Sequence, residues 1–184
     1  MKSIIATLSK FISKIHIPYN HKKMTEEECE EIISILKPGD VVLSHTDGEL
    51  SNLFLEYWGH GMIISTSGLY EAVTLGVRET NMMYAFSRKD DIIVLRPRFP
   101  IYENQLESWC KYAEGTSYDY NFETSAEKLY CFEMVMDSLI AGSDFRYYQE
   151  IINYKKTLLG EQILGSSFTD KVGTEFEVAW RKRI

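Results

Sequence analysis

Residues 38–80 read PGDVVLSHTDGELSNLFLEYWGHGMIISTSGLYEAVTLGVRET, and this stretch decides the fold. Short runs rich in aliphatic and β-branched residues lie within it and just after it, at 41–45, 61–66, 69–74 and 91–97. Such runs are typical of β-strands, and Ser67-Gly68 between the second and third runs predicts a tight hairpin turn. Successive hairpins favour a small antiparallel sheet.

Helical patterns surround these strands. Thr25 and Glu28 have the spacing of a capping box, which predicts a helix over residues 26–36 that ends at Pro38-Gly39. Further helical patterns lie at 102–114, 124–140 and 146–158, and the tail through residue 180 predicts a short strand and irregular structure. The sequence therefore predicts an α+β fold with helices on either side of a small sheet or barrel.

Composition is that of one folded domain and excludes several functions. The chain has 184 residues, 45% of them hydrophobic and 26% charged. Its net charge is −7, so we expect no nucleic-acid partner. The 3 cysteines and 4 histidines show no metal-ligand spacing and no even cysteine set, so we expect no metal, no cofactor and no disulfide framework. An odd cysteine count suits a reducing compartment.

The N-terminal 17 residues, MKSIIATLSKFISKIHI, form an amphipathic helical pattern with a basic polar face. Lysines interrupt the apolar run, so the pattern indicates neither a signal peptide nor a membrane span, and we expect a cytoplasmic protein. The helix either docks on the protein's own core or makes a peripheral membrane contact through residues 3–15. We divide the chain into residues 1–24, this helix and a linker, and 25–184, the folded domain.

His60 is the first candidate for chemistry. It stands at the start of a predicted strand between Gly59 and Gly61, which leave room for a ligand to approach, although a histidine there is more often structural. Glu71 lies in the next strand. With Ser67-Gly68 as the central pair of the turn, Glu71 would oppose Ile64 and lie several residues from His60, whereas a wider turn would shift this register.

Cys131 is the second candidate. If a helix begins just before it, backbone N–H groups and the helix dipole stabilise its thiolate. Thr124 and Glu127 instead have capping-box spacing, which would begin the helix near Ser125 and bury Cys131 two turns inside it. Periodicity leaves both starts open.

Four ordered segments add a resemblance. They are residues 38–80, DDIIVLRP at 90–97, GTSYDYNF at 115–122 and LYCFEMV at 129–135. In order and spacing they resemble the permuted papain-like amidases of the YiiX/YaeF group, circularly permuted relatives of the NlpC-type hydrolases. The Tyr-Cys-Phe context also resembles a poxvirus member of the permuted group, so the chain could be encoded by a phage or virus.

The resemblance implies a permuted papain-like fold and a Cys-His-Glu triad. Cys131 would be the nucleophile of a helix beginning near Leu129, with His60 as base and Glu71 orienting the histidine. Candidates for the oxyanion site and pocket are Tyr118, Tyr130 and Phe132. Packing beneath the nucleophile helix is an equal explanation for Tyr118.

The function that follows is a cysteine hydrolase that cleaves an amide or ester bond of a peptide, acyl-amine or lipid substrate. An acyltransferase would use the same residues, and a peptidoglycan peptidase fits the NlpC kinship. The alternative is a non-catalytic binding protein of a membrane or virion that retains the fold. Pocket-lining loops carry specificity, so the sequence names neither the substrate nor the oligomeric state.

Overall fold

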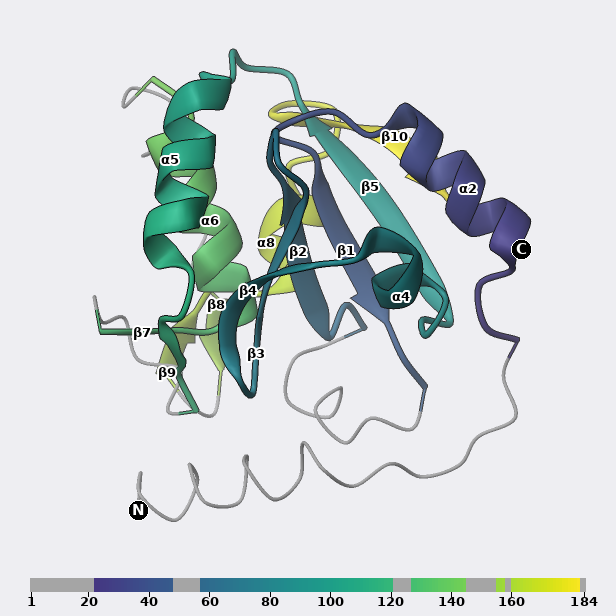
Figure 1. The fold of residues 1–184 in the computed structure, drawn as a ribbon, viewed down its shortest axis with the longest axis horizontal. Helices are drawn as coiled ribbons and strands as arrows, with labels where there is room; N and C mark the ends of the chain where they lie inside the picture. The colour runs from purple at the N-terminus through teal and green to yellow at the C-terminus, as the bar shows by residue number, and fades with distance from the viewer. Residues whose placement is uncertain (1–21, 48–56, 121–126, 145–154, 158–159, 183–184) are drawn as a thin grey trace.

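The computed structural model describes residues 22–47, 57–120, 127–144, 155–157 and 160–182 (Figure 1). The predicted helix over residues 1–17 lies outside the described residues, so the division at residue 24 stays a prediction. Within the described ranges, every helix is too short or too polar to cross a membrane.

A six-stranded antiparallel sheet forms the centre of the molecule. Its strands are β1 (Val41–His45), β2 (His60–Ile64), β3 (Leu69–Val73), β4 (Gly76–Thr80), β5 (Asp91–Pro97) and β10 (Phe176–Arg181). The order across the sheet is β10-β5-β1-β2-β3-β4, and each neighbouring pair is antiparallel. The predicted α+β fold is confirmed, and of the two forms predicted, sheet or barrel, the sheet is open.

Helices cover both faces of this sheet. They are α2 (Glu26–Ile35), α4 (Met82–Phe86), α5 (Glu103–Ala113), α6 (Cys131–Ala141) and α8 (Gly165–Thr169). In Figure 1, α5 and α6 stand together on one side of the sheet and α2 lies on the other. Alternation along β1 separates the two cores: Val41 and Leu43 pack with α6 residues, and Val42 packs with α2 residues.

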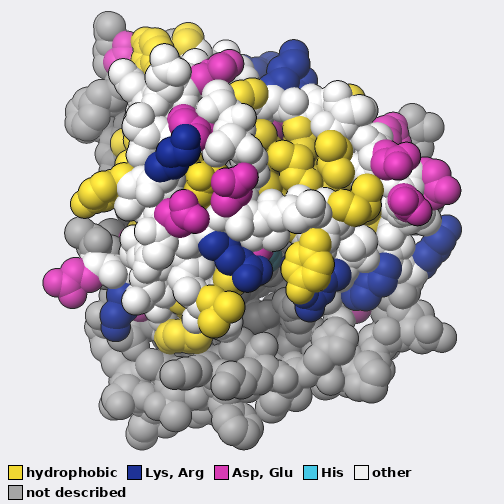
Figure 2. All heavy atoms as spheres, in the orientation of Figure 1, with side chains coloured by type: hydrophobic (Ala, Val, Ile, Leu, Met, Phe, Trp, Pro, Cys, Tyr) yellow, Lys and Arg dark blue, Asp and Glu magenta, His cyan; other side chains and the backbone are white. Residues whose placement is uncertain are grey.

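The first helix forms as its sequence predicts. Thr25 Oγ1 accepts the N–H of Glu28 at 3.2 Å, and the Glu28 carboxylate accepts the N–H of Thr25 at 2.8 Å, which completes the capping box. Acidic side chains gather over α2 in Figure 2, where they complement the positive end of the helix dipole. Beyond the helix, buried Asp40 pairs with Arg96 at 2.7 Å and fixes the entry into β1.

The register of the β2–β3 hairpin differs from the predicted one. Ile64 pairs with Leu69, and Met62 pairs with Glu71, so four residues, 65–68, connect the strands instead of two. Glu107 of α5 causes the wider turn, because its carboxylate accepts hydrogen bonds from the hydroxyl groups of Ser65 and Thr66 and from the N–H of Ser67. The sequence of the hairpin contains no sign of this contact from a distant helix.

Two pairs of short strands complete the described fold. β6 (Ser117–Tyr118) runs parallel to β7 (Lys128–Leu129), and β8 (Lys155–Thr157) runs antiparallel to β9 (Gly160–Gln162). The predicted helix over residues 146–158 is wrong at residues 155–157, which pair as a strand with β9. Residues 145–154 lie outside the described part of the chain.

Candidate active site

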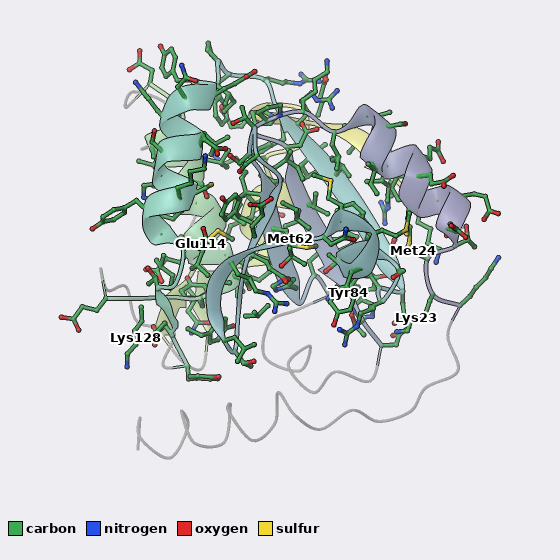
Figure 3. The ribbon with its side chains drawn as sticks, viewed as in Figure 1. Lys23, Met24, Met62, Tyr84, Glu114 and Lys128 are labelled. Carbon is green, nitrogen blue, oxygen red and sulfur yellow. The ribbon has the colours of Figure 1, made fainter. Side chains whose placement is uncertain are left out.

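Cys131 is the first residue of α6, and Tyr130 is the N-cap. The helix starts where the resemblance predicts, close to Leu129, and the start near Ser125 is wrong because Lys128 and Leu129 are extended and pair with β6. Figure 3 labels Lys128 on this strand, which leads directly into α6. Cys131 therefore lies at the positive end of an 11-residue helix, a position that stabilises a thiolate.

The helix end at Cys131 is not capped by the residue that precedes it. The Tyr130 side chain makes no capping hydrogen bond; its hydroxyl accepts the N–H of Ile163 at 2.9 Å instead. Backbone N–H groups of a first helical turn have no partner within the helix. They are therefore suited to receive negative charge that develops beside the sulfur.

His60 and Glu71 meet through the shifted register. Glu71 is the cross-strand partner of Met62, which Figure 3 labels within the sheet, and His60 is two residues from Met62 on the same face of β2. Diagonal neighbours at this separation are within reach of long side chains. His60 Nε2 lies 3.0 Å from Glu71 Oε2, so the carboxylate accepts the Nε2–H hydrogen bond and leaves Nδ1 of the ring for another partner.

Cys131 lies close enough to His60 to affect its protonation. Burial lowers the pKa of His60, but its interactions with Cys131 and with the Glu71 carboxylate outweigh burial and raise the pKa from 6.5 to about 9, against a smaller opposing effect of the Lys89 charge. The raised pKa favours an imidazolium that lies between the Glu71 carboxylate and the sulfur of Cys131. This is the electrostatic arrangement that papain-like chemistry needs.

Gly61 allows α6 to lie close to β2 beside the histidine. A Cβ atom at this position would lie 2.7 Å from Cδ1 of Phe132 and 3.4 Å from Cγ2 of Val135. A side chain at this position would meet the buried Phe132 ring, so the ring or the helix that carries it would have to move. The absence of a side chain at Gly61 thus sets the separation between the element that carries Cys131 and the element that carries His60.

The structure places the three further candidates around the helix start. Tyr118 pairs in register with Leu129, and burial, followed by the nearby Cys131, raises its pKa well above 10, so it stays a neutral hydroxyl that can donate a hydrogen bond. It also packs against the core, so both explanations of this residue remain. Tyr130 and Phe132 are 3% and 0% exposed, and Phe132 packs against Gly61 and Phe168.

Two residues that sequence reasoning missed also contact the candidate triad. Arg78 and Thr80 of β4 both donate hydrogen bonds to Glu71 Oε1. β4 was not predicted as a strand, because Val77 is its one apolar side chain and Arg78, Glu79 and Thr80 show no alternation. Without β4, nothing placed Arg78 beside Glu71.

Comparison with known proteins agrees with this architecture. A model of the family described as permuted papain-like amidase enzyme, YaeF/YiiX, C92 family, matches residues 35–173. The crystal structure of the metalloprotein yiiX from Escherichia coli O157:H7 matches with a TM-score of 0.61 and 17% sequence identity, covering 82% of this chain and 99% of that one. At this identity the likeness shows the fold. No curated protein matches the chain significantly.

The metal in the description of yiiX concerns that protein. In the described ranges of the present chain, no three His, Cys, Asp or Glu side chains are placed to hold a metal ion, so we derive no step through one. The family match covers most of the residues from which the sheet, α6 and the candidate triad are built. The chain belongs to the C92 family of permuted papain-like amidase enzymes, the family of YaeF and YiiX.

Proposed function

We propose that this protein is a cysteine hydrolase that cleaves an amide or ester bond through Cys131, His60 and Glu71. Membership of a papain-like amidase family supports a hydrolase of this general type. One observation carries the residue assignment: His60 is hydrogen-bonded to Glu71 at 3.0 Å, and Cys131, the first residue of a helix, is close enough to raise the pKa of the same imidazole. This arrangement supports the roles of nucleophile for Cys131, base for His60 and orienting group for Glu71.

The first half of the reaction forms an acyl-enzyme. The Cys131 thiolate attacks the acyl carbon, a sulfur–carbon bond forms, and the carbonyl oxygen becomes an oxyanion. The backbone N–H of Cys131 and the hydroxyl of Tyr118 are the donors that we assign to this oxyanion. When the carbon–nitrogen or carbon–oxygen bond breaks, the His60 imidazolium gives its proton to the leaving amine or alcohol.

The second half releases the acid. Neutral His60 takes a proton from water, the water oxygen bonds to the acyl carbon, and the sulfur–carbon bond breaks to restore the thiolate beside an imidazolium. Glu71 holds the Nε2–H throughout, so Nδ1 is the nitrogen that exchanges protons with Cys131, leaving group and water. An amine or alcohol in place of water would give acyl transfer by the same steps.

Specificity for the substrate depends on the residues around the candidate triad. Of the apolar residues before His60, Tyr57 is 52% exposed and Trp58 is 8% exposed, whereas Leu53 and Phe54 lie outside the described residues. We keep the substrate class as an acylated amine, peptide or lipid.

The test is to trap the acyl-enzyme. The purified protein is mixed with p-nitrophenyl acetate, butyrate and octanoate, and the release of nitrophenolate is followed together with the intact protein mass. We expect a burst and an acyl adduct that peptide mapping assigns to Cys131, both abolished in Cys131→Ala. Cys29→Ala is the matched control, since Cys29 is also buried but lies in α2 on the opposite face of the sheet.

An adduct on another residue, or equal burst in Cys131→Ala, would contradict the proposal. The same would follow if His60→Ala acylated at the wild-type rate. A folded protein with no acylation by any of the three esters would favour the alternative of a binding protein that retains the fold.

A further inference from the structure

The candidate triad is supported from a strand that lies outside it. Glu71 is the cross-strand partner of Arg78, and Thr80 is two residues further along β4 on the same face. Arg78 Nη2 and Nε lie 2.9 and 3.2 Å from Glu71 Oε1, and Thr80 Oγ1 lies 2.7 Å from the same oxygen. Glu71 Oε2 is thereby left to His60, at 3.0 Å.

We propose that Arg78 and Thr80 are positioning residues of the active site, which hold the Glu71 carboxylate by Oε1 so that Oε2 faces the His60 ring. The inference rests on the function proposed above. Neither residue touches the reacting atoms; both act through Glu71.

The geometry of the sheet explains why two donors are needed. His60 is a diagonal neighbour of Glu71 toward one end of the strands, and Thr80 is a diagonal neighbour toward the other end. The carboxylate is therefore drawn in opposite directions, which fixes its rotation about the last side-chain bond. A glutamate held only by His60 would lose this restraint and with it part of the orientation of the imidazole.

The charges of the residues that connect Arg78 to Cys131 alternate in sign. Glu71 is 8% exposed at its side chain, and burial alone would favour its neutral form. Hydrogen bonds from His60, Thr80 and Arg78 overcome burial and hold the pKa of Glu71 well below 4.5. Arg78, Glu71, His60 and Cys131 thus form a row of positive, negative, positive and negative groups when the thiolate forms.

The test is the pH dependence of Cys131 alkylation by iodoacetamide, measured by mass spectrometry of the Cys131 peptide. Thr80→Val removes the hydroxyl with little change in volume, and Thr80→Ser keeps it. Loss of one hydrogen bond to a charged, buried group is worth roughly a tenfold change in equilibrium. The pH at which the alkylation rate falls to half on the acid side, the acidic limb of the profile, should therefore move upward in Thr80→Val, by at most about one pH unit because Thr80 acts on Cys131 only through Glu71 and His60, and it should stay in place in Thr80→Ser.

Arg78 variants provide the second arm. Arg78→Gln should move the acidic limb upward by at least as much as Thr80→Val, because removing the guanidinium lets burial raise the pKa of Glu71. Arg78→Lys keeps the charge but not the two-nitrogen contact, so its limb should lie between those of the wild type and Arg78→Gln. Arg98→Gln is the matched control, since Arg98 is an exposed arginine beside Glu177 and far from the triad in the sheet.

A purely structural role would lower the melting temperature without moving the limb. In one outcome the wild type is alkylated rapidly in mild acid while folded Thr80→Val and Arg78→Gln have the same acidic limb as the wild type. That result overturns this inference and leaves the proposed function intact. A wild type with no rapid alkylation below neutral pH overturns both. Acidic limbs that move upward in the predicted order of variants support both this inference and the proposed function.

Discussion

Substitution of Gly61 by alanine tests whether the spacing between α6 and β2 controls the site. The added Cβ would meet Cδ1 and Cε1 of Phe132 at 2.7 and 3.0 Å, and ordinary contact begins near 3.4 Å. The ring must therefore retreat by about 0.7 Å, and Phe132 is fully buried at the first turn of the helix that carries Cys131. Overpacking of this kind costs about 1–3 kcal/mol of folding stability.

The effect on catalysis should exceed the effect on folding. A displacement on the order of 1 Å between reacting groups costs roughly 100-fold in rate, so Gly61→Ala should remain folded while the acylation of Cys131 slows severely. Urea unfolding gives the stability, and the rate of Cys131 acylation by p-nitrophenyl butyrate gives the activity. Gly68→Ala is the control, since the nearest atom to its new Cβ is the movable end of Glu79.

Phe132→Leu in the Gly61→Ala background adds a rescue. The smaller side chain makes room for the new methyl group, so the double variant should regain part of both the stability and the acylation rate, a coupling that is larger than additivity allows. Wild-type stability and acylation in Gly61→Ala alone would refute the reasoning, because the helix would then have no need of the glycine.

The remaining predictions concern stability. Asp40→Asn should lower the free energy of unfolding in urea by about 3 kcal/mol, since it leaves Arg96 partly buried without its charged partner; a loss below about 1 kcal/mol would contradict this. The folded-state pKa of His60, about 9, lies above 6.5, so its contribution to stability is complete below pH 6.5 and is lost as pH rises to 9. Between pH 6.5 and 9, the free energy of unfolding in urea should fall more steeply with pH in the wild type than in His60→Gln. Equal slopes in the two proteins would argue against the raised pKa of His60. Glu71 has a lowered pKa, so its contribution to folding stability is present above pH 4.5 and declines as the pH falls below that value. Glu71→Gln should abolish this acid-dependent loss of stability in the same assay. Glu107→Ala should increase amide hydrogen exchange in the β2–β3 turn while leaving β5 protected, and an unchanged turn would show that the carboxylate does not pin it.

Local signals predicted much of the fold because they act over a few residues. The Thr25–Glu28 capping box begins α2, and the strands at 41–45 and 91–97 have the predicted bounds. These elements depend on caps, turn residues and alternation, which a single sequence displays. The helices α2 and α5, predicted over 26–36 and 102–114, follow from the same kind of local pattern.

Long-range contacts explain what the sequence did not predict. The β2–β3 register depends on Glu107, a residue of a helix about 40 positions later in the chain. The start of α6 depends on the pairing of β7 with β6, which overrides the capping signal at Thr124. β4 is rich in polar residues and was therefore not predicted as a strand. It pairs with β3, and Arg78 of β4 donates a hydrogen bond to Glu71 across this pair.

The candidate site was likewise predicted only in part. Cys131, His60 and Glu71 could be singled out because the resemblance carried their order and context, whereas the hairpin register predicted from the turn alone would have kept His60 and Glu71 apart. Met62 pairs with Glu71 only after a two-residue shift, and that shift makes the 3.0 Å contact with His60 geometrically accessible.

The central claim is that His60 keeps the Cys131 thiol in its reactive form. Its most direct test is the rate of iodoacetamide alkylation of Cys131 at about pH 6, where a free thiol is almost wholly protonated, in the wild type and in His60→Ala. The account predicts rapid alkylation in the wild type and at least a tenfold slower reaction in the variant. Equally slow alkylation in both proteins would show that the pair is not assembled and would contradict the account.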